Sequence, residues 1–453
     1  MFYFNKFFST MPAKKANDPL LKFWALLSKQ EQQNLTLQIK QINRTLLGQQ
    51  IALIKPSKSV DPFIEPFKDY AFAGNEKLKL KGKQLLQNGK MGCIILAGGQ
   101  GTRLCFGGPK GLFPVSVIKH KSLFQLLAEK TVAASKQVNF PLSLAIMTSP
   151  ENDQATKQFF VKNNYWGLSK DQISFFCQST LPLLNAEGSL FLETKSRIAE
   201  GPNGNGHCLH DFYQSGLYDV WKQRGIEYIN VILVDNPLAD PFDAELLGFH
   251  HQQNAEITIK CTEKHEPQEK VGIIVKENQR VKVIEYSELS DQHKNASEAN
   301  GRLQYCCANL SLFCFSMTFI ENTLPNHPFL PLHKAWKAAK FVNEQGITTL
   351  SSHPIAWKFE TFIFDWLQYS KKVFALLYPR HQCFAPLKNF QGDDSLESVQ
   401  KALIYREKEI LKSITGLEPS SNLIELAADF YYPTADLLNK WKNRLAKTLY
   451  VEP

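Results

Sequence analysis

A short glycine-rich segment after Leu96 carries the strongest chemical signal in the sequence. It reads LAGGQGTRL, followed by GGPKG, and directly follows an apolar run, Cys93 to Leu96, that is predicted to be a buried strand. Glycines at this place let backbone N–H groups converge, and such groups bind phosphate oxygens. Arg103 and Lys110 add two positive charges, whose hydrogen bonds to anions are about twice as strong as neutral ones. The segment therefore predicts a phosphate-binding loop.

Two common nucleotide-binding motifs do not describe this loop. It lacks the Gly-Lys-Ser or Gly-Lys-Thr ending of a Walker A motif, and Gly101 is followed by TRL instead of the x-x-G of a dinucleotide-binding motif. Hydride transfer is therefore disfavoured. A tight turn that needs positive φ would explain the glycines but not Arg103 and Lys110.

A carboxylate is expected at the same edge of the predicted sheet. Asp235 follows the apolar run Val231 to Val234, and ligands of parallel sheets bind at the carboxyl ends of the strands. Magnesium takes hard oxygen donors, and one or two carboxylates with phosphate oxygens and water are enough. Asp235 is therefore a candidate magnesium ligand, and the alternative is an Asp that caps the following turn.

The elements that must position these groups alternate between strand-like and helical segments. Helices are predicted over 123–138 and 210–224, and strands over 93–96, 142–147, 173–177, 228–234, 257–261, 272–275 and 282–285. This alternation is typical of an α/β protein with a mixed, mostly parallel sheet covered on both faces.

Three regions are predicted along the chain. Residues 1–88 form a helical N-terminal region, with helical spacing over 19–54, a linker from Pro56 to Pro66 and a helix over 76–88. Residues 89–377 form the catalytic domain. Residues 378–453 form a small C-terminal domain with a loop over 385–394 and helices over 396–414 and 435–449.

Composition narrows the class of protein. The 453 residues are 43% hydrophobic and 21% charged, which is typical of a globular protein, and the net charge of +9 is spread along the chain. Anionic ligands are therefore expected rather than nucleic acid, and no apolar run approaches the roughly 20 residues of a membrane span. Nine cysteines without a CxxC pair favour reduced thiols, and hence a cytoplasmic protein.

The glycine-rich loop resembles the signature of the eukaryote-type UDP-sugar pyrophosphorylases, most closely the UDP-N-acetylhexosamine pyrophosphorylases. The resemblance covers nearly the whole chain. Eight further segments are similar to that family in the same order: MTS from Met147, Gln178 before Leu181-Pro182, PNGNG from Pro202, VDN from Val234, EYSE from Glu285, Ala308-Asn309, KFETFIFD from Lys358 and FAPLKN from Phe384.

The resemblance implies a Rossmann-like nucleotidyltransferase core and a magnesium-dependent transfer of uridylyl from UTP to N-acetylglucosamine 1-phosphate. It implies that Arg103 and Lys110 hold the triphosphate, that Lys358 grips the sugar phosphate and the α-phosphate, and that Asp235 binds Mg2+. The implied nucleotide-binding residues are Gly98, Gly99, Gly101, Thr102, Gln178 and Gly204, and the implied sugar-binding residues are Asn205, Glu285 and Asn309. If the resemblance is set aside, the alternative interpretation of Lys358 is a solvated lysine at the start of a helix.

Asn205 bears on the choice of sugar. Relatives that act on glucose 1-phosphate resemble one another in carrying His at this position, whereas the N-acetylhexosamine enzymes carry Asn in DGNGG, and an Asn amide can pair with an acetamido group. The chain departs from the family at His207, which replaces the last glycine of that motif, and at Cys306, where the family has NAGN.

Two other functions stay open. One keeps the chemistry and uses glucose 1-phosphate or several sugars, and the other is a nucleotide-sugar binding protein without turnover. The segment Phe384 to Asn389 is interpreted either as a cover for the site or as structural packing. No oligomeric state follows from the sequence.

Overall fold

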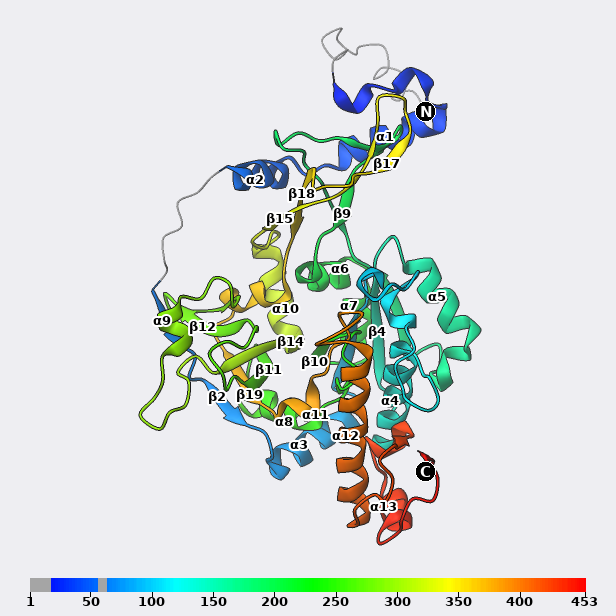
Figure 1. The fold of residues 1–453 in the computed structure, drawn as a ribbon, viewed down its shortest axis with the longest axis vertical. Coiled ribbons are helices and arrows are strands. Elements are labelled where there is room, and N and C mark those ends of the chain that lie inside the picture. The colour runs from blue at the N-terminus through cyan, green and yellow to red at the C-terminus, as the bar shows by residue number, and fades with distance from the viewer. Residues whose placement is uncertain (1–17, 56–62) are drawn as a thin grey trace. The chain divides into compact units, whose positions relative to one another are not determined.

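The structure is a computed structural model that describes residues 18–55 and 63–453 (Figure 1). The chain divides into two compact units. The smaller unit comprises Ser179–Gly206, Phe329–Phe362 and the described part of Met1–Asp61. The larger unit comprises the described part of Pro62–Gln178, together with His207–Pro328 and Ile363–Pro453. The division into 1–88, 89–377 and 378–453 stays a prediction.

The larger unit is built on a mixed sheet that confirms the predicted α/β class. Along the path β2-β19-β11-β14-β10-β3-β4-β5, every pair is parallel except the two that β14 forms. The strands of this path are β2 (Tyr70–Phe72), β3 (Met91–Leu96), β4 (Ser143–Thr148), β5 (Ile173–Cys177), β10 (Tyr228–Leu233), β11 (Ile257–Glu263), β14 (Cys307–Ser316) and β19 (Val373–Leu377). β1 (Ile64–Pro66), β12 (Ile273–Glu277) and β13 (Arg280–Ile284) extend the sheet.

Strand β3 shows why the strands of the central sheet are apolar on both faces. Met91, Cys93 and Ile95 lie in a core with residues of α3 (Glu76–Gln87) and α4 (Leu123–Val138). On the opposite face, a Cβ added at Gly92 would lie 2.3 Å from the ring of Trp221 in α7 (Leu217–Gln223). Because both faces are covered, the strand reads as one continuous hydrophobic run rather than an alternating one.

Helices α3 and α8 (Ala244–Gln252) lie side by side with their backbones in direct contact (Figure 1). A Cβ at Gly82 would lie 1.6 Å from the carbonyl oxygen of Ala244, and one at Gly248 would lie 1.9 Å from that of Leu78. Only glycine fits at these two positions, so this pair of helices depends on them.

The other helices of the larger unit require two corrections. The single helix predicted over 210–224 is two helices, α6 (Cys208–Gln214) and α7, because Gly216 adopts a left-handed φ of 81° between them. The helix predicted over 435–449 ends early, as α13 (Ala435–Trp441). The remaining helices are α5 (Asp153–Lys162), α9 (Asp291–Asn295), α10 (Met317–Thr323), α11 (Arg380–Cys383) and α12 (Leu396–Thr415), and β20 (Glu425–Leu426) pairs with β21 (Tyr450–Val451).

The predicted linker from Pro56 to Pro66 is partly wrong. Residues 56–62 lie outside the described residues, but Ile64–Pro66 form β1, which pairs with β12 only. An edge strand tolerates proline because one side of it makes no ladder hydrogen bonds.

The smaller unit combines helices with short antiparallel sheets. It holds α1 (Lys29–Gln41) and α2 (Arg44–Ile54), which confirm the helical pattern over 19–54. The strand pairs are β6 (Thr180–Pro182) with β9 (Glu200–Pro202), β7 (Leu192–Thr194) with β8 (Arg197–Ile198), β15 (His333–Lys337) with β18 (Ala356–Glu360), and β16 (Lys340–Val342) with β17 (Thr348–Leu350).

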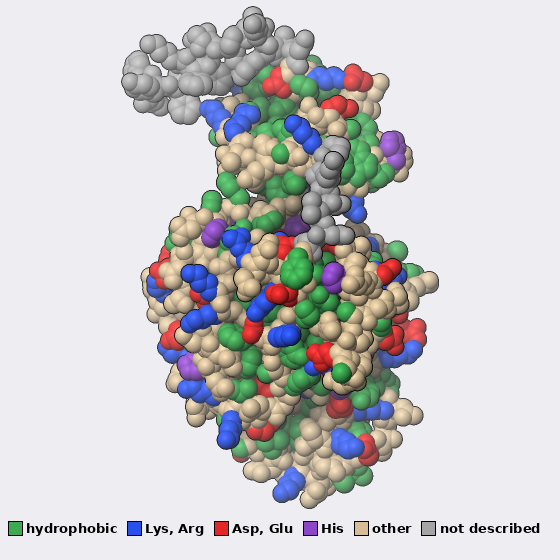
Figure 2. All heavy atoms as spheres, turned by 90° about the vertical axis from the view of Figure 1, so that its left-hand side faces the viewer, with side chains coloured by type: hydrophobic (Ala, Val, Ile, Leu, Met, Phe, Trp, Pro, Cys, Tyr) green, Lys and Arg blue, Asp and Glu red, His purple; other side chains and the backbone are tan. Residues whose placement is uncertain are grey.

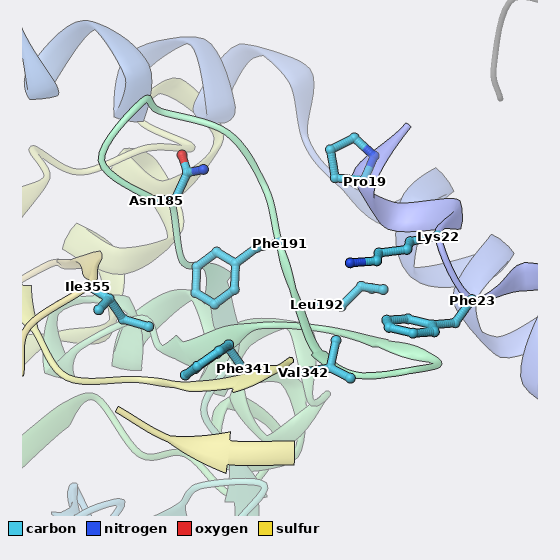
Figure 3. Close-up of a pocket in the computed structure, with 9 residues that line it drawn as sticks. All are labelled: Pro19, Lys22, Phe23, Asn185, Phe191, Leu192, Phe341, Val342 and Ile355. Atoms are coloured by element: carbon cyan, nitrogen blue, oxygen red, sulfur yellow. The ribbon is translucent and has the colours of Figure 1, made fainter. Parts of the chain in front are cut away.

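An apolar cavity of about 300 Å³ lies inside the smaller unit (Figure 3). The side chains of Phe23, Phe191 and Phe341 line it, and Lys22 at its edge pairs with Glu344 at 2.6 Å. None of the residues predicted to bind substrate lines this cavity. Its apolar lining does not suit a phosphate group.

Two further observations concern the helices and the surface charge. Among the described residues, none of the helices has the length and apolar character that a membrane crossing requires. On the face shown in Figure 2, Lys and Arg side chains are interspersed with Asp and Glu side chains.

One buried carboxyl group predicts a pH dependence of stability. Glu407 in α12 is 4% exposed and accepts hydrogen bonds from the Tyr431 hydroxyl at 2.9 Å and the Leu426 N–H at 3.2 Å. Burial raises the pKa of Glu407 to about 8, from an ordinary 4.5. The folded protein therefore keeps a proton that the unfolded chain releases, and this contribution is complete below the unfolded pKa and lost as pH rises through the folded one.

Replacing Glu407 with Gln is expected to flatten the pH dependence of the unfolding free energy. The wild-type carboxyl group contributes a loss of up to about 1.4 kcal/mol per pH unit between the two pKa values, and a neutral amide contributes none. Urea unfolding at a series of pH values measures this difference. Parallel curves for the two proteins would contradict the raised pKa.

Candidate active site

The glycine-rich loop folds back on itself after β3. The Gly101 N–H donates to the Gly108 carbonyl at 2.9 Å, and the Lys110 N–H donates to the Gly99 carbonyl at 3.2 Å. These bonds hold two short 3-10 turns, one at Thr102–Leu104 with Arg103 and one at Lys110–Leu112. The Arg103 side chain is exposed and has no ion-pair partner in the described part of the chain, so it is available to an anion.

Some glycines of this loop, Gly98 and Gly111 among them, allow close packing, and none has an unusual backbone angle. None of the glycines from Gly98 to Gly111 has a positive φ, so the tight-turn interpretation is wrong. A Cβ at Gly98 would lie 2.4 Å from Oε1 of Gln178, which follows β5 and is 6% exposed. A Cβ at Gly99 would meet nothing within 4 Å. The structure thus places the Gln178 amide directly against Gly98, beside an open stretch of backbone at Gly99.

Asn152 is a positioning residue that the sequence analysis missed. Its Nδ2 donates to the Ala97 carbonyl at 2.9 Å, and its Oδ1 accepts from the Ser149 N–H at 2.8 Å. This side chain ties the start of the loop to the end of β4. The only signal in the sequence is its place just after the MTS motif, which names no partner.

Lys110 and Asp235 form an ion pair at the carboxyl edge of the sheet. Strands β3 and β10 are parallel neighbours, so the segments that follow them meet. Lys110 Nζ lies 3.2 Å from Asp235 Oδ2, and the two side chains are only 12% and 14% exposed. Asp235 Oδ1 is buried and has no hydrogen-bond partner among the described residues. A buried carboxylate oxygen without a partner is costly, so this oxygen is suited to a cation.

The segment carrying Asp235 is clamped by the FAPLKN region. The Leu387 N–H donates to the Asp235 carbonyl at 2.7 Å, while the Asn236 side chain donates to the Cys383 carbonyl at 2.8 Å and accepts from the Ala385 N–H at 3.0 Å. Asn236 is fully buried. In the structure, this region therefore fixes the backbone on which Asp235 sits.

Three further predicted residues come together in the smaller unit. Gly204 has a φ of 86°, and a Cβ there would lie 2.2 Å from the Thr361 carbonyl oxygen. Thr361 in turn donates through its N–H and its hydroxyl to the Asn203 carbonyl, at 2.8 and 3.0 Å. This fixes the PNGNG loop, with Gly204 and Asn205, against the end of β18. Lys358 lies on the same strand.

Lys358 is on a strand and not at the start of a helix. Its Nζ lies 2.7 Å from Glu360 Oε1, two residues along β18, where side chains share one face. A Cβ at Gly201 would lie 3.3 Å from Lys358 Cε, so the stem of the lysine packs on the glycine of β9. The alternative interpretation of this lysine is therefore wrong about its secondary structure.

Glu285 and Asn309 meet at Gly272 in the larger unit. The Asn309 N–H donates to the Gly272 carbonyl at 2.8 Å, and a Cβ at Gly272 would lie 3.2 Å from Glu285 Oε1. Asn309 Oδ1 accepts from the Ser311 N–H at 3.0 Å. Two residues that are distant in the sequence thus border the same short segment.

The two departures from the family motif have defined surroundings. His207 Nδ1 lies 3.1 Å from Asp211 Oδ1, and its ring stacks on His210 at a centroid distance of 4.5 Å. Cys306 is buried, and a hydrogen bond with the Cys307 thiol lowers the pKa of Cys306 to about 7, helped by Arg302 and opposed by burial. His207 therefore belongs to a histidine pair at the start of α6.

A glycine-rich loop after strand β3 of a mixed α/β sheet, with a lysine and a carboxylate at the carboxyl edge, is the arrangement expected of a nucleotidyltransferase. The family model described as UTP-glucose-1-phosphate uridylyltransferase matches residues 30–446. The chain belongs to this family of UDP-sugar pyrophosphorylases. The resemblance drawn from the motifs is thereby confirmed.

Individual relatives agree with this assignment. The chain is 32% identical over 426 residues to a Schizosaccharomyces pombe protein named "Probable UDP-N-acetylglucosamine pyrophosphorylase", covering 90% of this chain and 88% of that protein. It is 29% identical over 451 residues to the UDP-N-acetylglucosamine pyrophosphorylase of Saccharomyces cerevisiae, covering 93% and 94%. The crystal structure of the Trypanosoma brucei UDP-N-acetylglucosamine pyrophosphorylase in complex with an inhibitor matches with a TM-score of 0.76 at 25% identity, over 87% of this chain and 83% of that one.

Proposed function

We propose that this protein transfers uridylyl from UTP to N-acetylglucosamine 1-phosphate and releases pyrophosphate, with Mg2+ as cofactor. The observation that carries the proposal is the Lys110–Asp235 pair beside the glycine-rich loop, with one carboxylate oxygen left for a cation. The names of the relatives support the sugar.

The reaction joins an oxygen of the sugar phosphate to the α-phosphorus of UTP and breaks the bond between that phosphorus and pyrophosphate. Both reactants are anions, so the protein supplies positioning and positive charge rather than covalent chemistry. Arg103 and Lys110 hold the triphosphate and its leaving pyrophosphate. Lys358 neutralises the sugar phosphate and the α-phosphate, while Gly101 and Thr102 contribute to the nucleotide-binding loop.

Asp235 is the residue that would hold Mg2+. No group of three or more His, Cys, Asp or Glu side chains in residues 18–55 and 63–453 could bind a metal, so phosphate oxygens and water would complete the ligand set. A bound Mg2+ would neutralise charge on the phosphates as the leaving group departs. The buried Asp235 Oδ1, which has no other partner in the described chain, fits this role.

Uracil is recognised by the Gln178 amide together with the backbone at Gly98, Gly99 and Gly204. An amide both donates and accepts, which suits the alternating edge of the base. Asn205, Glu285 and Asn309 contact the hydroxyl and acetamido groups of the sugar. The nine cysteines are free, so we also propose a reducing, cytoplasmic location.

The decisive test is pyrophosphate release by the purified protein with UTP and Mg2+, in parallel with the 1-phosphates of N-acetylglucosamine, N-acetylgalactosamine and glucose. Preference for N-acetylglucosamine supports the proposal. Preference for glucose 1-phosphate would support uridylyl transfer but contradict the proposed sugar substrate. Release with none of the three sugar phosphates would favour a binding protein without turnover.

Replacing Asn205 with His is expected to shift the preference toward glucose 1-phosphate. The amide pairs with the acetamido group, and leaving a polar site group unpaired costs about 1–3 kcal/mol, which penalises the wrong sugar by about 10-fold to 100-fold. The ratio of kcat/KM for the two sugar phosphates measures this shift. An unchanged ratio would remove Asn205 from sugar recognition.

Replacing Gly98 with Ala is expected to raise KM for UTP about tenfold, with a smaller effect on kcat. The added methyl group would stand 2.4 Å from Gln178 Oε1 and displace the amide from the base, at a cost of about one hydrogen bond. Gly107→Ala is the matched control, because a Cβ there meets nothing within 4 Å. Equal KM values for the two variants would contradict the role of Gln178.

A further inference from the structure

Another cavity, which is polar and has a volume of about 320 Å³, lies in the larger unit between helices α3, α4, α8 and α12. Its lining contains five basic side chains: Lys79, Lys83, Lys130, Lys260 and Arg406. None of the residues assigned to substrate or metal above lines it. The active-site proposal therefore leaves this cavity unexplained.

Most of the acidic oxygens in the cavity already have partners. Lys260 pairs with Asp243 at 2.5 Å, which neutralises both. Glu245 accepts from the N–H groups of Gly74 and Asn75, each at 2.6 Å, at the start of α3. The third carboxyl group, Asp240, accepts from the Tyr432 hydroxyl and from the Phe242 N–H.

The lining holds five basic side chains and three acidic ones, and Lys79 also pairs with Glu76 at 3.5 Å. Lys83 has no ion-pair partner in the described chain, and burial lowers its pKa, with Lys79 adding to that effect. Arg406 Nη1 lies 3.4 Å from Glu409 Oε2. Lys130 is 3% exposed, and burial lowers its pKa to about 8. Because basic side chains outnumber acidic ones in the lining, an anion bound among them is attracted by the excess of positive charge.

Lys130 also connects the cavity to the segment that carries Asp235. Its Nζ donates to the carbonyl groups of Pro237 at 2.7 Å and Ala239 at 3.1 Å, and lies 4.4 Å from the centre of the Tyr431 ring. An ammonium group has three protons, so one stays available to a ligand. An anion that attracts Lys130 therefore changes the hold on the backbone two residues from Asp235.

We propose that this cavity is a regulatory site for a small phosphate-bearing anion, bound by Lys83, Lys130 and Arg406. Phosphate fits because its several acceptor oxygens and two negative charges suit the ammonium and guanidinium donors that line the cavity. Occupancy changes turnover through the Lys130 contacts to residues 237 and 239. The binding part of the proposal is independent of the proposed reaction, whereas the regulatory part rests on it.

The test is calorimetric titration of the full chain with inorganic phosphate and, separately, with a hexose 6-phosphate, at constant ionic strength. Lys83→Gln and Arg406→Gln are each expected to weaken binding at least tenfold, while Lys81→Gln, an exposed lysine on the same helix, leaves it unchanged. Tighter binding of the hexose phosphate than of phosphate identifies a sugar phosphate as the source, and equal binding identifies the free ion.

Two controls separate this site from the glycine-rich loop. Binding that is lost in Lys110→Ala but kept in Lys83→Gln places the anion at the loop and overturns the proposal. Binding that none of these variants weakens, or that chloride at equal ionic strength reproduces, overturns it as well.

A second measurement tests the regulation. With saturating substrates, phosphate is expected to change the rate of the wild-type protein at least twofold and to leave that of Lys83→Gln unchanged. Equal responses of the two proteins overturn the regulatory role. If the wild-type protein shows no turnover, the proposed function fails while the calorimetric result still decides whether the cavity binds the anion.

Discussion

Replacing Lys110 with Ala is expected to lower kcat about a thousandfold, a loss typical for removing a preorganised charge from a developing anion. The side chain is 12% exposed, so water screens its charge weakly, and it faces the carboxylate proposed to hold the metal. Alanine removes the positive charge from the leaving pyrophosphate and leaves Asp235 without its partner. The measurement is single-turnover pyrophosphate release with UTP and the preferred sugar phosphate.

The Lys110→Ala protein is expected to fold normally, because the residue lies in a surface loop whose backbone bonds do not use the side chain. Circular dichroism and the thermal midpoint check this. Lys170→Ala is the control, since Lys170 is exposed and distant in sequence from the loop. Near-normal turnover in Lys110→Ala would refute the assigned role of this lysine.

Replacing Asp235 with Asn is expected to lower kcat about a hundredfold and to raise the Mg2+ concentration for half-maximal rate about tenfold. Asn keeps the size of the side chain but loses the charge that binds both Lys110 and the cation. The Leu387 N–H donates to the main-chain carbonyl of Asp235 and not to its side chain, so the segment is expected to stay in place. A titration of the rate against Mg2+ measures both effects.

An Asp219→Asn variant controls for the loss of a negative charge, because Asp219 is exposed on α7. It is expected to behave like the wild type at every Mg2+ concentration. An Asp235→Asn protein with reduced kcat but an unchanged Mg2+ dependence would separate Asp235 from the metal and leave it only as the partner of Lys110.

Local signals in the sequence were sufficient for the main elements. The strands of the sheet near the loop were predicted because strands buried on both faces are continuous apolar runs, as at β3. Helices α4 and α12 were predicted because their apolar residues recur at helical spacing. The break at Gly216 was missed because apolar spacing continues across it.

The strand β14 shows where local signals end. Cys307–Ser316 is mostly buried and largely apolar, and it runs antiparallel between β10 and β11. An apolar run reports burial, but it says nothing about direction, which depends on where the chain enters the sheet. For the same reason, the grouping of Ser179–Gly206 with Phe329–Phe362 in one unit has no signature in either segment alone.

By itself, the sequence determined the α/β class, the glycine-rich loop after a buried strand and the placing of Asp235 after another, because each depends on residues close together in the chain. The tertiary structure decided which groups meet: Gln178 against Gly98, Lys110 with Asp235 across 125 residues, and the basic cavity beside Lys130. Such contacts depend on strand order, register and side-chain packing, and these are properties of the whole fold rather than of any one segment.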